Sequence, residues 1–319
     1  TVLASFLGGW PSDPFVRNKP LLFIVFLYIF SAFGCALANG MVLFTAARFI
    51  GVLGIGISTV AAPLYISEIS PPAYRGRLAG MFQFNIVFGI VVAFASNAVI
   101  ARIGGEDAWR WMLGIAAVPS IIYAALCFGL PESPRWLIGR RGDRAAGLAV
   151  LRLIEPDLPQ SHIDAHADQI LAAARSEKAA ASRFWTRRLR VPILLAFLVA
   201  FFNQLSGVNA ILYFAPRIFE MTGLAKEAAL LQSVGIGITN LIFTFVGLWL
   251  IDRLGRRTLL FIGSLGYILS LGMTSWAFFT AHHAIVPVCI FAFMASHAVG
   301  QGAVIWVLIS EIFPNRHRA

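Results

Sequence analysis

The sequence predicts an all-α membrane protein in which two helical bundles are joined by a polar, helical linker. Of its 319 residues, 59% are hydrophobic and only 13% are charged, whereas a soluble domain carries about 25% charged residues. The apolar residues form eight runs long enough to cross a bilayer, and short motifs of the first half recur in the second. This composition excludes an ordinary soluble enzyme, and it excludes disorder, which requires low hydrophobicity and high charge.

Eight segments are predicted to span the membrane, because a spanning helix needs about 20 mostly apolar residues. They are residues 21–39, 41–66, 78–100, 111–130, 191–216, 228–251, 258–281 and 284–310. The mean hydropathy of +0.79 agrees with lipid as the main solvent. Residues 1–10 resemble the last half of a further span, and the chain ends in a basic segment just beyond a span. We therefore expect an internal piece of a longer multi-pass protein.

The positive charges predict how the spans are oriented. Most of the 25 Lys and Arg residues lie in alternate connecting segments, including the long segment 131–190. Cytoplasmic loops of membrane proteins are enriched in Lys and Arg, so these segments are predicted to be cytoplasmic in a multi-pass protein of the cell (inner) membrane. This distribution accounts for the net charge of +10. No nucleic-acid partner is predicted, because no basic patch is interleaved with aromatic residues.

The chain contains an internal repeat. The motif E-I-x-P-x-x-x-R begins at Glu68 and again at Glu311, about 240 residues later. In each half, an Asp/Arg-containing segment that begins at Asp13 or at Asp252 precedes this motif by two spans. Such duplicated halves predict two bundles that rock against each other. The predicted divisions are an N-terminal bundle (1–130), a cytoplasmic helical linker (131–190) and a C-terminal bundle (191–319).

Charged residues at the cytoplasmic ends of the spans are predicted to bridge the two halves. Charge at a membrane boundary is costly unless it is paired or functional. The predicted pairs are Glu68 with Arg256 or Arg257, and Glu311 with Arg75 or Arg77. Pairs that form in one state and break in another would provide a two-state switch.

The linker shows no sign of an enzyme. Residues 131–190 contain no Gly-rich phosphate loop and no Ser/His/Asp grouping, so neither a cofactor nor catalysis is predicted. His162 and His166 lie four residues apart, but no third ligand is evident, which favours a solvated helix face over a metal site. The three cysteines each lie in an apolar run and are predicted to be buried and free.

Uncharged polar side chains inside the spans are the candidate ligand-binding residues. They are Gln83, Asn85, Asn203, Gln204, Ser206, Asn209, Asn240 and Trp306. Amides both donate and accept hydrogen bonds, and an indole covers an apolar surface, so this set suits a neutral, polyhydroxylated ligand. Ser206-Gly207, within the densest cluster, predicts a local helix break of the kind that lines transporter sites. The alternative, that amides such as these only bond neighbouring helices, stays open.

At these residues the sequence resembles the sugar porter family of the major facilitator superfamily, over essentially its whole length. The motifs that carry the resemblance are R-F-I-G-V-L-G from Arg48, P-L-Y-I-S-E-I-S-P from Pro63, P-E-S-P-R-W-L from Pro131, Q-L-S-G-V-N from Gln204, D-R-L-G-R-R from Asp252 and W-V-L-I-S-E-I-F-P from Trp306. Many facilitators share the D-R-x-G-R-R loop, whereas P-E-S-P-R and Q-x-S-G-x-N together are specific to sugar porters.

The resemblance implies a major facilitator fold with twelve spans, of which this chain would lack the first, half of the second and the last two. It also implies three sets of functional residues. The sugar would contact Gln83, Asn203, Gln204, Asn209, Asn240 and Trp306, and an extracellular gate would contain Tyr213 and Phe214. A cytoplasmic charge network would contain Glu68, Arg75, Glu132, Arg135, Asp252, Arg256, Arg257 and Glu311.

Three positions depart from the family pattern. Asn203 stands where the family usually has Gln, which shortens that arm of the site. The segment that begins at Asp13 lacks the Gly of the corresponding family loop. Ala303 replaces a common Pro three residues before Trp306. In proton-coupled relatives, an acidic residue of the first span lies beside the Arg that matches Arg48, so Arg48 is the candidate coupling residue.

The preferred functional hypothesis is transport of a monosaccharide by alternating access, coupled to protons. Its partners would be the sugar, protons and membrane lipid. Two alternatives stay open within the same resemblance: a facilitative uniporter for a sugar or polyol, and a sensor that binds sugar without transporting it. A third is that the chain as given is inactive, because absent spans would expose one wall of the cavity.

Overall fold

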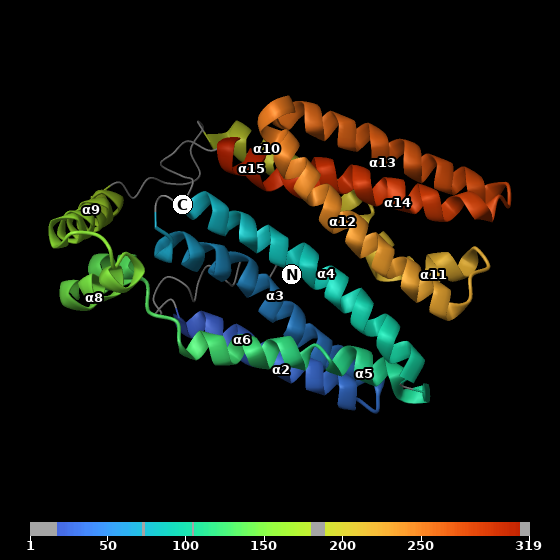
Figure 1. Ribbon diagram of the computed structural model, residues 1–319, viewed down its shortest axis with the longest axis horizontal. Helices are drawn as coiled ribbons and strands as arrows, with labels where there is room; N and C mark the ends of the chain where they lie inside the picture. Colours follow the sequence, from blue (N-terminus) through green and yellow to red (C-terminus); the bar gives the residue numbers. More distant parts are fainter. Residues whose placement is uncertain (1–17, 72–73, 104, 180–188, 313–319) are drawn as a thin grey trace. The chain divides into compact units, whose positions relative to one another are not determined.

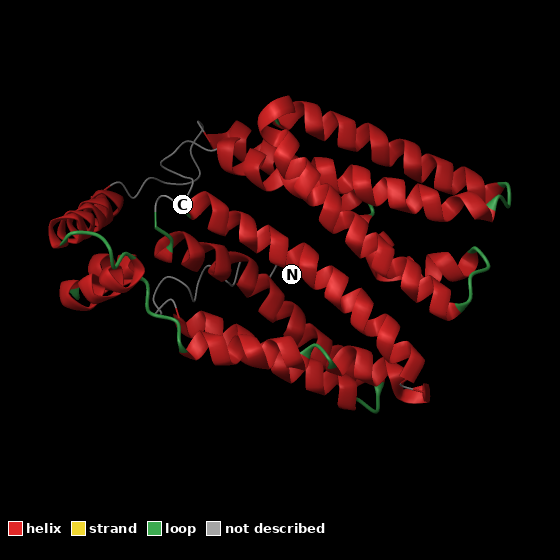
Figure 2. Cartoon of the chain, viewed as in Figure 1, coloured by secondary structure: helices red, strands yellow, loops and turns green. Residues whose placement is uncertain are grey.

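The computed structural model describes residues 18–71, 74–103, 105–179 and 189–312, and every regular element within these ranges is helical (Figure 2). Eight segments in this part of the chain are long and apolar enough to cross a membrane. They are Asn18–Leu37, Met41–Ile69, Met81–Ile103, Gly105–Phe128, Arg190–Met221, Lys226–Ile251, Arg256–Phe279 and His283–Gly302. Each predicted span coincides with one of them, so the predicted all-α membrane fold is confirmed.

The helices group into two compact units. The first unit contains the residues up to Phe82 and those from Ile103 to the end of the linker helices. The second contains Gln83–Arg102 and the residues after the linker. The domain boundaries predicted at residues 130 and 190 stay a prediction.

The first unit is built around a hairpin of two spanning helices, α2 (Asn18–Leu37) and α3 (Met41–Ile69) (Figure 1). Its core joins Ile24 of α2 and Ile57 of α3 to Cys127 of the next span in this unit. The Tyr65 hydroxyl donates to the Pro131 carbonyl at 2.7 Å, which ties the cytoplasmic end of α3 to the start of the linker. The cysteines Cys35, Cys127 and Cys289 are buried and free, as predicted.

The predicted span 111–130 is not one continuous helix. It consists of α5 (Ala108–Gly114), preceded by the short helix η1 (Gly105–Asp107), and α6 (Ala117–Phe128). Pro119 lies in the first turn of α6, where a proline has no N–H to donate to the carbonyl four residues earlier and its ring clashes with that carbonyl. The helix is therefore interrupted at Ile115 and Ala116.

The linker forms a small helical layer with its own core. Its elements are α7 (Pro134–Trp136), η2 (Leu137–Arg141), α8 (Arg144–Ile154) and α9 (Gln160–Ala179). The Asp143 side chain caps α8 by accepting from the Ala146 N–H at 3.0 Å. Leu151 packs with residues of α9. Arg144 hydrogen-bonds Asp168, and this carboxylate raises the pKa of the guanidinium. The predicted helical character of the linker is thus confirmed.

The second unit contains the remaining spans. They are α4 (Arg75–Ile103), of which Gln83–Arg102 belong to this unit, α10 (Arg190–Leu205), α11 (Val208–Met221), α12 (Lys226–Leu254), α13 (Arg256–Phe279), η4 (His283–Ile285), α14 (Val286–His297), η5 (Ala298–Gly302) and α15 (Ala303–Ile312). Phe219 of α11, Ile236 of α12 and Phe293 of α14 are fully buried in its core. The predicted span 284–310 is interrupted by η5, a single π-helical turn.

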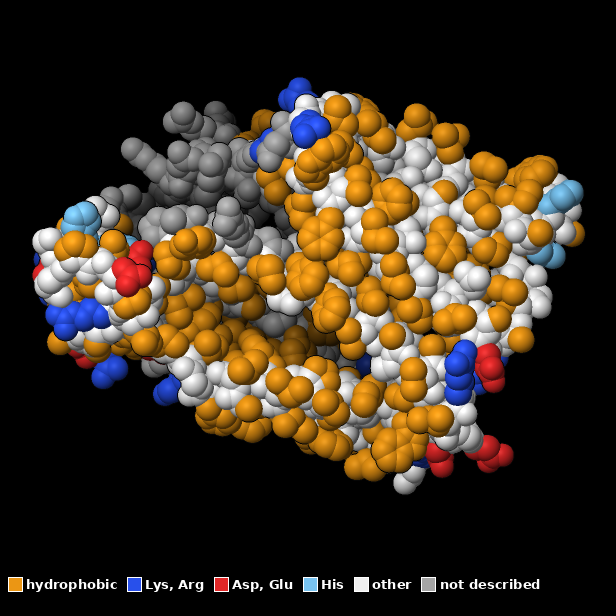
Figure 3. All heavy atoms as spheres, in the orientation of Figure 1, with side chains coloured by type: hydrophobic (Ala, Val, Ile, Leu, Met, Phe, Trp, Pro, Cys, Tyr) orange, Lys and Arg blue, Asp and Glu red, His pale blue; other side chains and the backbone are white. Residues whose placement is uncertain are grey.

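Figure 3 shows one face of the molecule, on which hydrophobic side chains cover the spanning helices. On the face shown, charged side chains gather over the linker helices and at the ends of the spans. Large apolar residues such as Phe261 and Phe279 are 76% and 92% exposed. Such exposure is expected where lipid, rather than water, surrounds the helices.

Two glycines bring α13 and η5 into direct backbone contact. A Cβ placed on Gly263 would lie 2.7 Å from the Gly300 Cα and 2.9 Å from the Ser296 carbonyl oxygen. Both neighbours are backbone atoms, which cannot rotate away as a side chain would. Small residues at helix crossings of this kind allow close packing inside membranes.

Replacing Gly263 with alanine is therefore expected to destabilise the second unit by about 1–3 kcal/mol, because the two helices must separate. Thermal unfolding of the purified protein in detergent would measure the loss. Gly272→Ala is the matched control on the same helix, since a Cβ there meets nothing within 4 Å. Equal melting temperatures for the two variants would show that the crossing is not tight.

Candidate functional site

The broken span between α10 and α11 is the centre of the candidate site. The break lies at Ser206-Gly207, where the sequence predicted it. Gly207 has φ 82° and ψ 6°, a left-handed conformation that side chains with a Cβ disfavour. The Ser206 hydroxyl donates to the Asn203 carbonyl at 2.6 Å, which satisfies one of the last carbonyls of α10.

Two of the predicted ligand-binding amides meet across this break. Asn209 Nδ2 donates a hydrogen bond of 2.7 Å to Gln204 Oε1. Both side chains are exposed. This bond does not use Gln204 Nε2 or Asn209 Oδ1, which remain available for a further hydrogen bond. The pair therefore offers one donor and one acceptor side by side.

Three further polar side chains of this unit are withdrawn from the surface. Asn203 is half-buried, and among the described residues its Oδ1 has no hydrogen-bond partner. Asn240 of α12 is 8% exposed. Thr244, one turn later, is 3% exposed, and its hydroxyl likewise has no partner in the described part of the chain. Buried polar atoms without partners are costly, so each such atom is a candidate for contact with a ligand or water.

Gln83 belongs to the same unit as these residues. It is half-buried on α4, whose next residue, Phe84, has its ring centre 5.8 Å from that of Phe245 on α12. A Cβ on Gly237 would lie 3.2 Å from the Val91 Cα, so α4 and α12 run antiparallel in this contact. With a rise of 1.5 Å per residue, Gln83 lies roughly 9 Å along α12 from the level of Asn240.

The structure describes the predicted extracellular gate but not the side chain of the predicted stacking residue, Trp306. Tyr213 and Phe214 lie in the first half of α11 and are 78% and 61% exposed. Trp306 lies in α15, but its side chain is outside the described residues, as is the predicted loop that begins at Asp13. The gating role and the stacking role stay predictions.

The predicted cytoplasmic charge network is described only in part. Glu132 accepts from the Ser133 N–H at 2.9 Å, and Glu68 is half-buried at the end of α3. Arg135 is exposed on α7 and Arg257 is exposed on α13, whereas Arg256 is half-buried. The side chains of Arg75, Arg77, Asp252 and Glu311 lie outside the described residues. The bridges between the halves therefore stay predictions.

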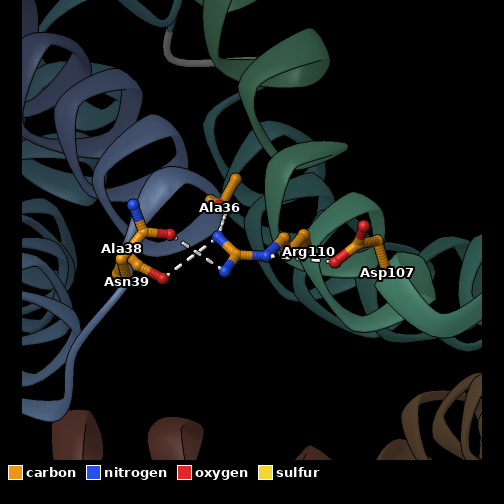
Figure 4. Close-up of polar contacts among 5 residues, drawn as sticks. All are labelled: Ala36, Ala38, Asn39, Asp107 and Arg110. Atoms are coloured by element: carbon orange, nitrogen blue, oxygen red, sulfur yellow. Dashed lines mark hydrogen bonds and ion pairs between the residues drawn. The ribbon is translucent and has the colours of Figure 1, made fainter.

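Two arginines within the spanning segments have different surroundings. Arg48, the predicted coupling residue, is exposed in the first half of α3. Arg110 of α5 instead clamps the end of α2 (Figure 4). Its Nη1 donates to the carbonyls of Ala36 and Ala38, at 3.0 Å each, and its Nη2 donates to Asn39 Oδ1 at 3.1 Å. Arg110 thus satisfies carbonyls that the helix end leaves free.

Arg110→Ala is expected to destabilise the first unit by about 1–3 kcal/mol, because it leaves these carbonyls without a donor. Thermal unfolding in detergent would measure the loss. Arg217→Ala is the matched control. Arg217 is 72% exposed and pairs with Glu220 only one turn away, so its loss is expected to cost at most about 0.5 kcal/mol. An Arg110 variant as stable as the Arg217 variant would contradict the clamp.

Sequence reasoning did not single out three buried polar residues as candidates. They are Thr244, His297 and Gln301, and each carries a polar side-chain atom without a partner among the described residues. Thr244 had a signal, since it lies four residues after Asn240 on the same helical face. Gln301 had a weaker signal, as an amide between two glycines in an apolar run.

The eight apolar spans in the described part of the chain define a multi-pass membrane protein, and one of them carries uncharged amides at the break between α10 and α11. The family described as Sugar (and other) transporter matches residues 1–319, and the chain belongs to this family. The family resemblance that the motifs carried is therefore confirmed. The predicted multi-pass membrane location and the predicted transport of sugars by alternating access are confirmed with it.

Named relatives extend over almost the whole chain. The arabinose-proton symporter of Bacillus subtilis strain 168 is 34% identical over 320 residues, which cover 98% of this chain and 68% of that protein. The D-xylose-proton symporter of Escherichia coli K12 is 31% identical over 341 residues, which cover 99% of this chain and 68% of that protein. A solved structure of the E. coli xylose transporter XylE, in a partially occluded inward-open conformation, superposes with a TM-score of 0.85. The two sequences are 29% identical, and the match covers 98% of this chain and 72% of the XylE chain. The major facilitator fold is confirmed.

Proposed function

We propose that this chain carries a monosaccharide across the cell membrane by alternating access in symport with protons. It performs no covalent chemistry, and its partners are the sugar, protons and the surrounding lipid. The observation that carries the proposal is the hydrogen bond of 2.7 Å between Asn209 and Gln204 across the helix break at Gly207. Paired uncharged amides inside a membrane span are matched to a neutral ligand that both donates and accepts hydrogen bonds.

The other predicted residues take supporting roles in this proposal. Asn240 presents a buried amide from α12, and Asn203 and Gln83 present half-buried amides from α10 and α4. Trp306 would cover an apolar face of the sugar ring. Tyr213 and Phe214 would close the extracellular side, and Arg48 would take part in coupling. The cytoplasmic network would open and close the opposite side through Glu68, Arg75, Glu132, Arg135, Asp252, Arg256, Arg257 and Glu311.

The amide pair defines the kind of group that it binds. Gln204 Nε2 can only donate and Asn209 Oδ1 can only accept, so one hydroxyl that does both fits between them. Replacing that hydroxyl with fluorine removes the donor. A site built to hydrogen-bond a hydroxyl discriminates strongly against an analogue that lacks it.

Competition by a series of singly fluorinated deoxy sugars would test this assignment. Fluorine at one position of the ring is expected to weaken inhibition by roughly 100-fold, while fluorine at the other positions has a small effect. If the amide pair holds no hydroxyl, the fluorinated sugars would inhibit equally well at every position.

Proton coupling is tested by uptake into proteoliposomes with and without an imposed pH gradient. The proposal predicts that an inwardly directed proton gradient drives accumulation above equilibrium, and that a protonophore abolishes it. Saturable uptake that equilibrates and ignores the gradient would instead establish the uniporter alternative. A panel of arabinose, xylose, glucose and myo-inositol would separate sugar from polyol transport.

A further inference from the structure

Gln301 is a buried amide that the proposed sugar site does not use. It lies in η5, the π-helical turn that joins α14 to α15, and is 7% exposed. Burying an amide within a membrane span is costly unless the amide is paired. Its contacts therefore show what holds this turn in place.

Both halves of the Gln301 amide face α13. Its Nε2 donates to the Ser264 hydroxyl at 2.9 Å and lies 3.5 Å from the Tyr267 hydroxyl. Its Oε1 lies beside Gly263, where a Cβ would approach it to 3.1 Å, and it has no hydrogen-bond partner among the described residues. The amide nitrogen of Gln301 is thus hydrogen-bonded to α13. The amide oxygen also lies against α13, but it has no hydrogen-bond partner among the described residues.

The same turn touches α13 through its backbone. Gly263 and Gly300 meet closely enough that a Cβ on either glycine would lie within 2.8 Å of the other's Cα. A π-helical turn is rare and often marks a functional position in a helix. Here the turn is fixed by two neighbouring attachments, a backbone contact at Gly300 and a side-chain bond at Gln301.

Helix α15 begins directly after this turn and carries Trp306. The direction in which α15 leaves η5 determines where Trp306 stands relative to the amides of α10 and α11. We propose that Gln301 is a positioning residue whose hydrogen bond to Ser264 sets the direction of α15 and thereby the fit of the sugar. This inference rests on the proposed function, because it assigns Trp306 to the sugar site.

Sugar exchange by the Gln301→Leu, Ser264→Ala and double variants would test the coupling of the two residues. Hydrogen bonds between membrane helices contribute about 1 kcal/mol, so each single variant is expected to raise KM by roughly 5-fold. The double variant is expected to raise KM no further than the stronger single variant, since both remove the same bond. Ser264→Thr keeps the hydroxyl and is expected to restore the KM of the parent protein.

Ser270→Ala provides the matched control on the same helix. Among the described residues, the Ser270 hydroxyl bonds only carbonyls of its own helix, those of Gly266 and Tyr267, so its loss is expected to leave KM unchanged. A purely structural role for Gln301 would lower the melting temperature of its variants without changing KM, and that result would overturn the inference.

A measurement without sugar separates this inference from the proposed function. Spin labels at Phe261→Cys on α13 and Ile312→Cys on α15, in a background with the three native cysteines replaced by alanine, report the distance between the helices. Gln301→Leu is expected to shift or broaden the distance distribution, whereas Ser270→Ala is not. An unchanged distribution would overturn the inference even if transport is confirmed. Absence of exchange by the folded parent protein would overturn the proposed function and the assignment of Trp306 to a sugar.

Discussion

Gln204→Ala is expected to lower the kcat/KM of sugar uptake by roughly 100-fold, the largest effect of any single substitution in the site. The change removes the donor that faces the ligand and also the acceptor that holds Asn209 at 2.7 Å. Losing one hydrogen bond and leaving a polar partner unsatisfied costs about 3 kcal/mol together, and each 1.4 kcal/mol corresponds to about tenfold. Initial rates of labelled-sugar uptake in proteoliposomes would measure it.

The control for this variant is Gln169→Ala. Gln169 is exposed on α9 of the linker, outside the spanning segments, and its replacement is expected to leave uptake unchanged. Both variants should melt at similar temperatures, because the Gln204 side chain is also exposed. Uptake by Gln204→Ala at more than half the parent rate would show that the amide pair does not contact the sugar.

Gly207→Val is expected to have the second-largest effect, a loss of uptake of roughly 10- to 100-fold. Gly207 has φ 82°, and a β-branched residue in this region is strained by about 1–3 kcal/mol. Relief of that strain would rotate α11 relative to α10 and separate Asn209 from Gln204. Uptake kinetics measured together with thermal unfolding would distinguish lost alignment from lost folding.

Two companion variants show whether the effect comes from the backbone. Asn tolerates the left-handed region better than other residues with a Cβ, so Gly207→Asn is expected to retain most activity. At Gly89, in α4, a Cβ meets nothing within 4 Å, so Gly89→Ala is expected to be neutral. If Gly207→Val transports as well as Gly207→Asn, the left-handed turn is not what holds the amide pair together.

The sequence was sufficient to predict the spans and the central break, because both depend on local chemistry. Runs of about 20 apolar residues have few other stable arrangements than spanning helices. The Ser206-Gly207 break was predictable because glycine is the residue that adopts a left-handed conformation without strain. The pairing of Gln204 with Asn209 is a consequence, since the break places both amides at the same helix junction.

Other features depend on contacts between distant residues, and the sequence alone did not predict them. The π turn Ala298–Gly302 lies where Gly300 approaches Gly263 on α13. The Arg110 clamp joins residues that lie 72 and 74 positions apart. The break between α5 and α6 had a local signal in the sequence, Pro119. A proline in an apolar run does not always break a helix, however, because Pro63 lies inside α3 and leaves that helix continuous. Tertiary packing decides between these outcomes.

Counterflow of labelled sugar is the most direct test of a carrier that works by alternating access. Proteoliposomes preloaded with unlabelled sugar and diluted into a trace of labelled sugar, without any pH gradient, should accumulate label transiently. The account predicts this overshoot for at least one monosaccharide and its loss in the Gln204→Ala variant. Folded parent protein that exchanges no sugar of the panel would contradict it, and retained binding of a sugar without exchange would support a sensor instead.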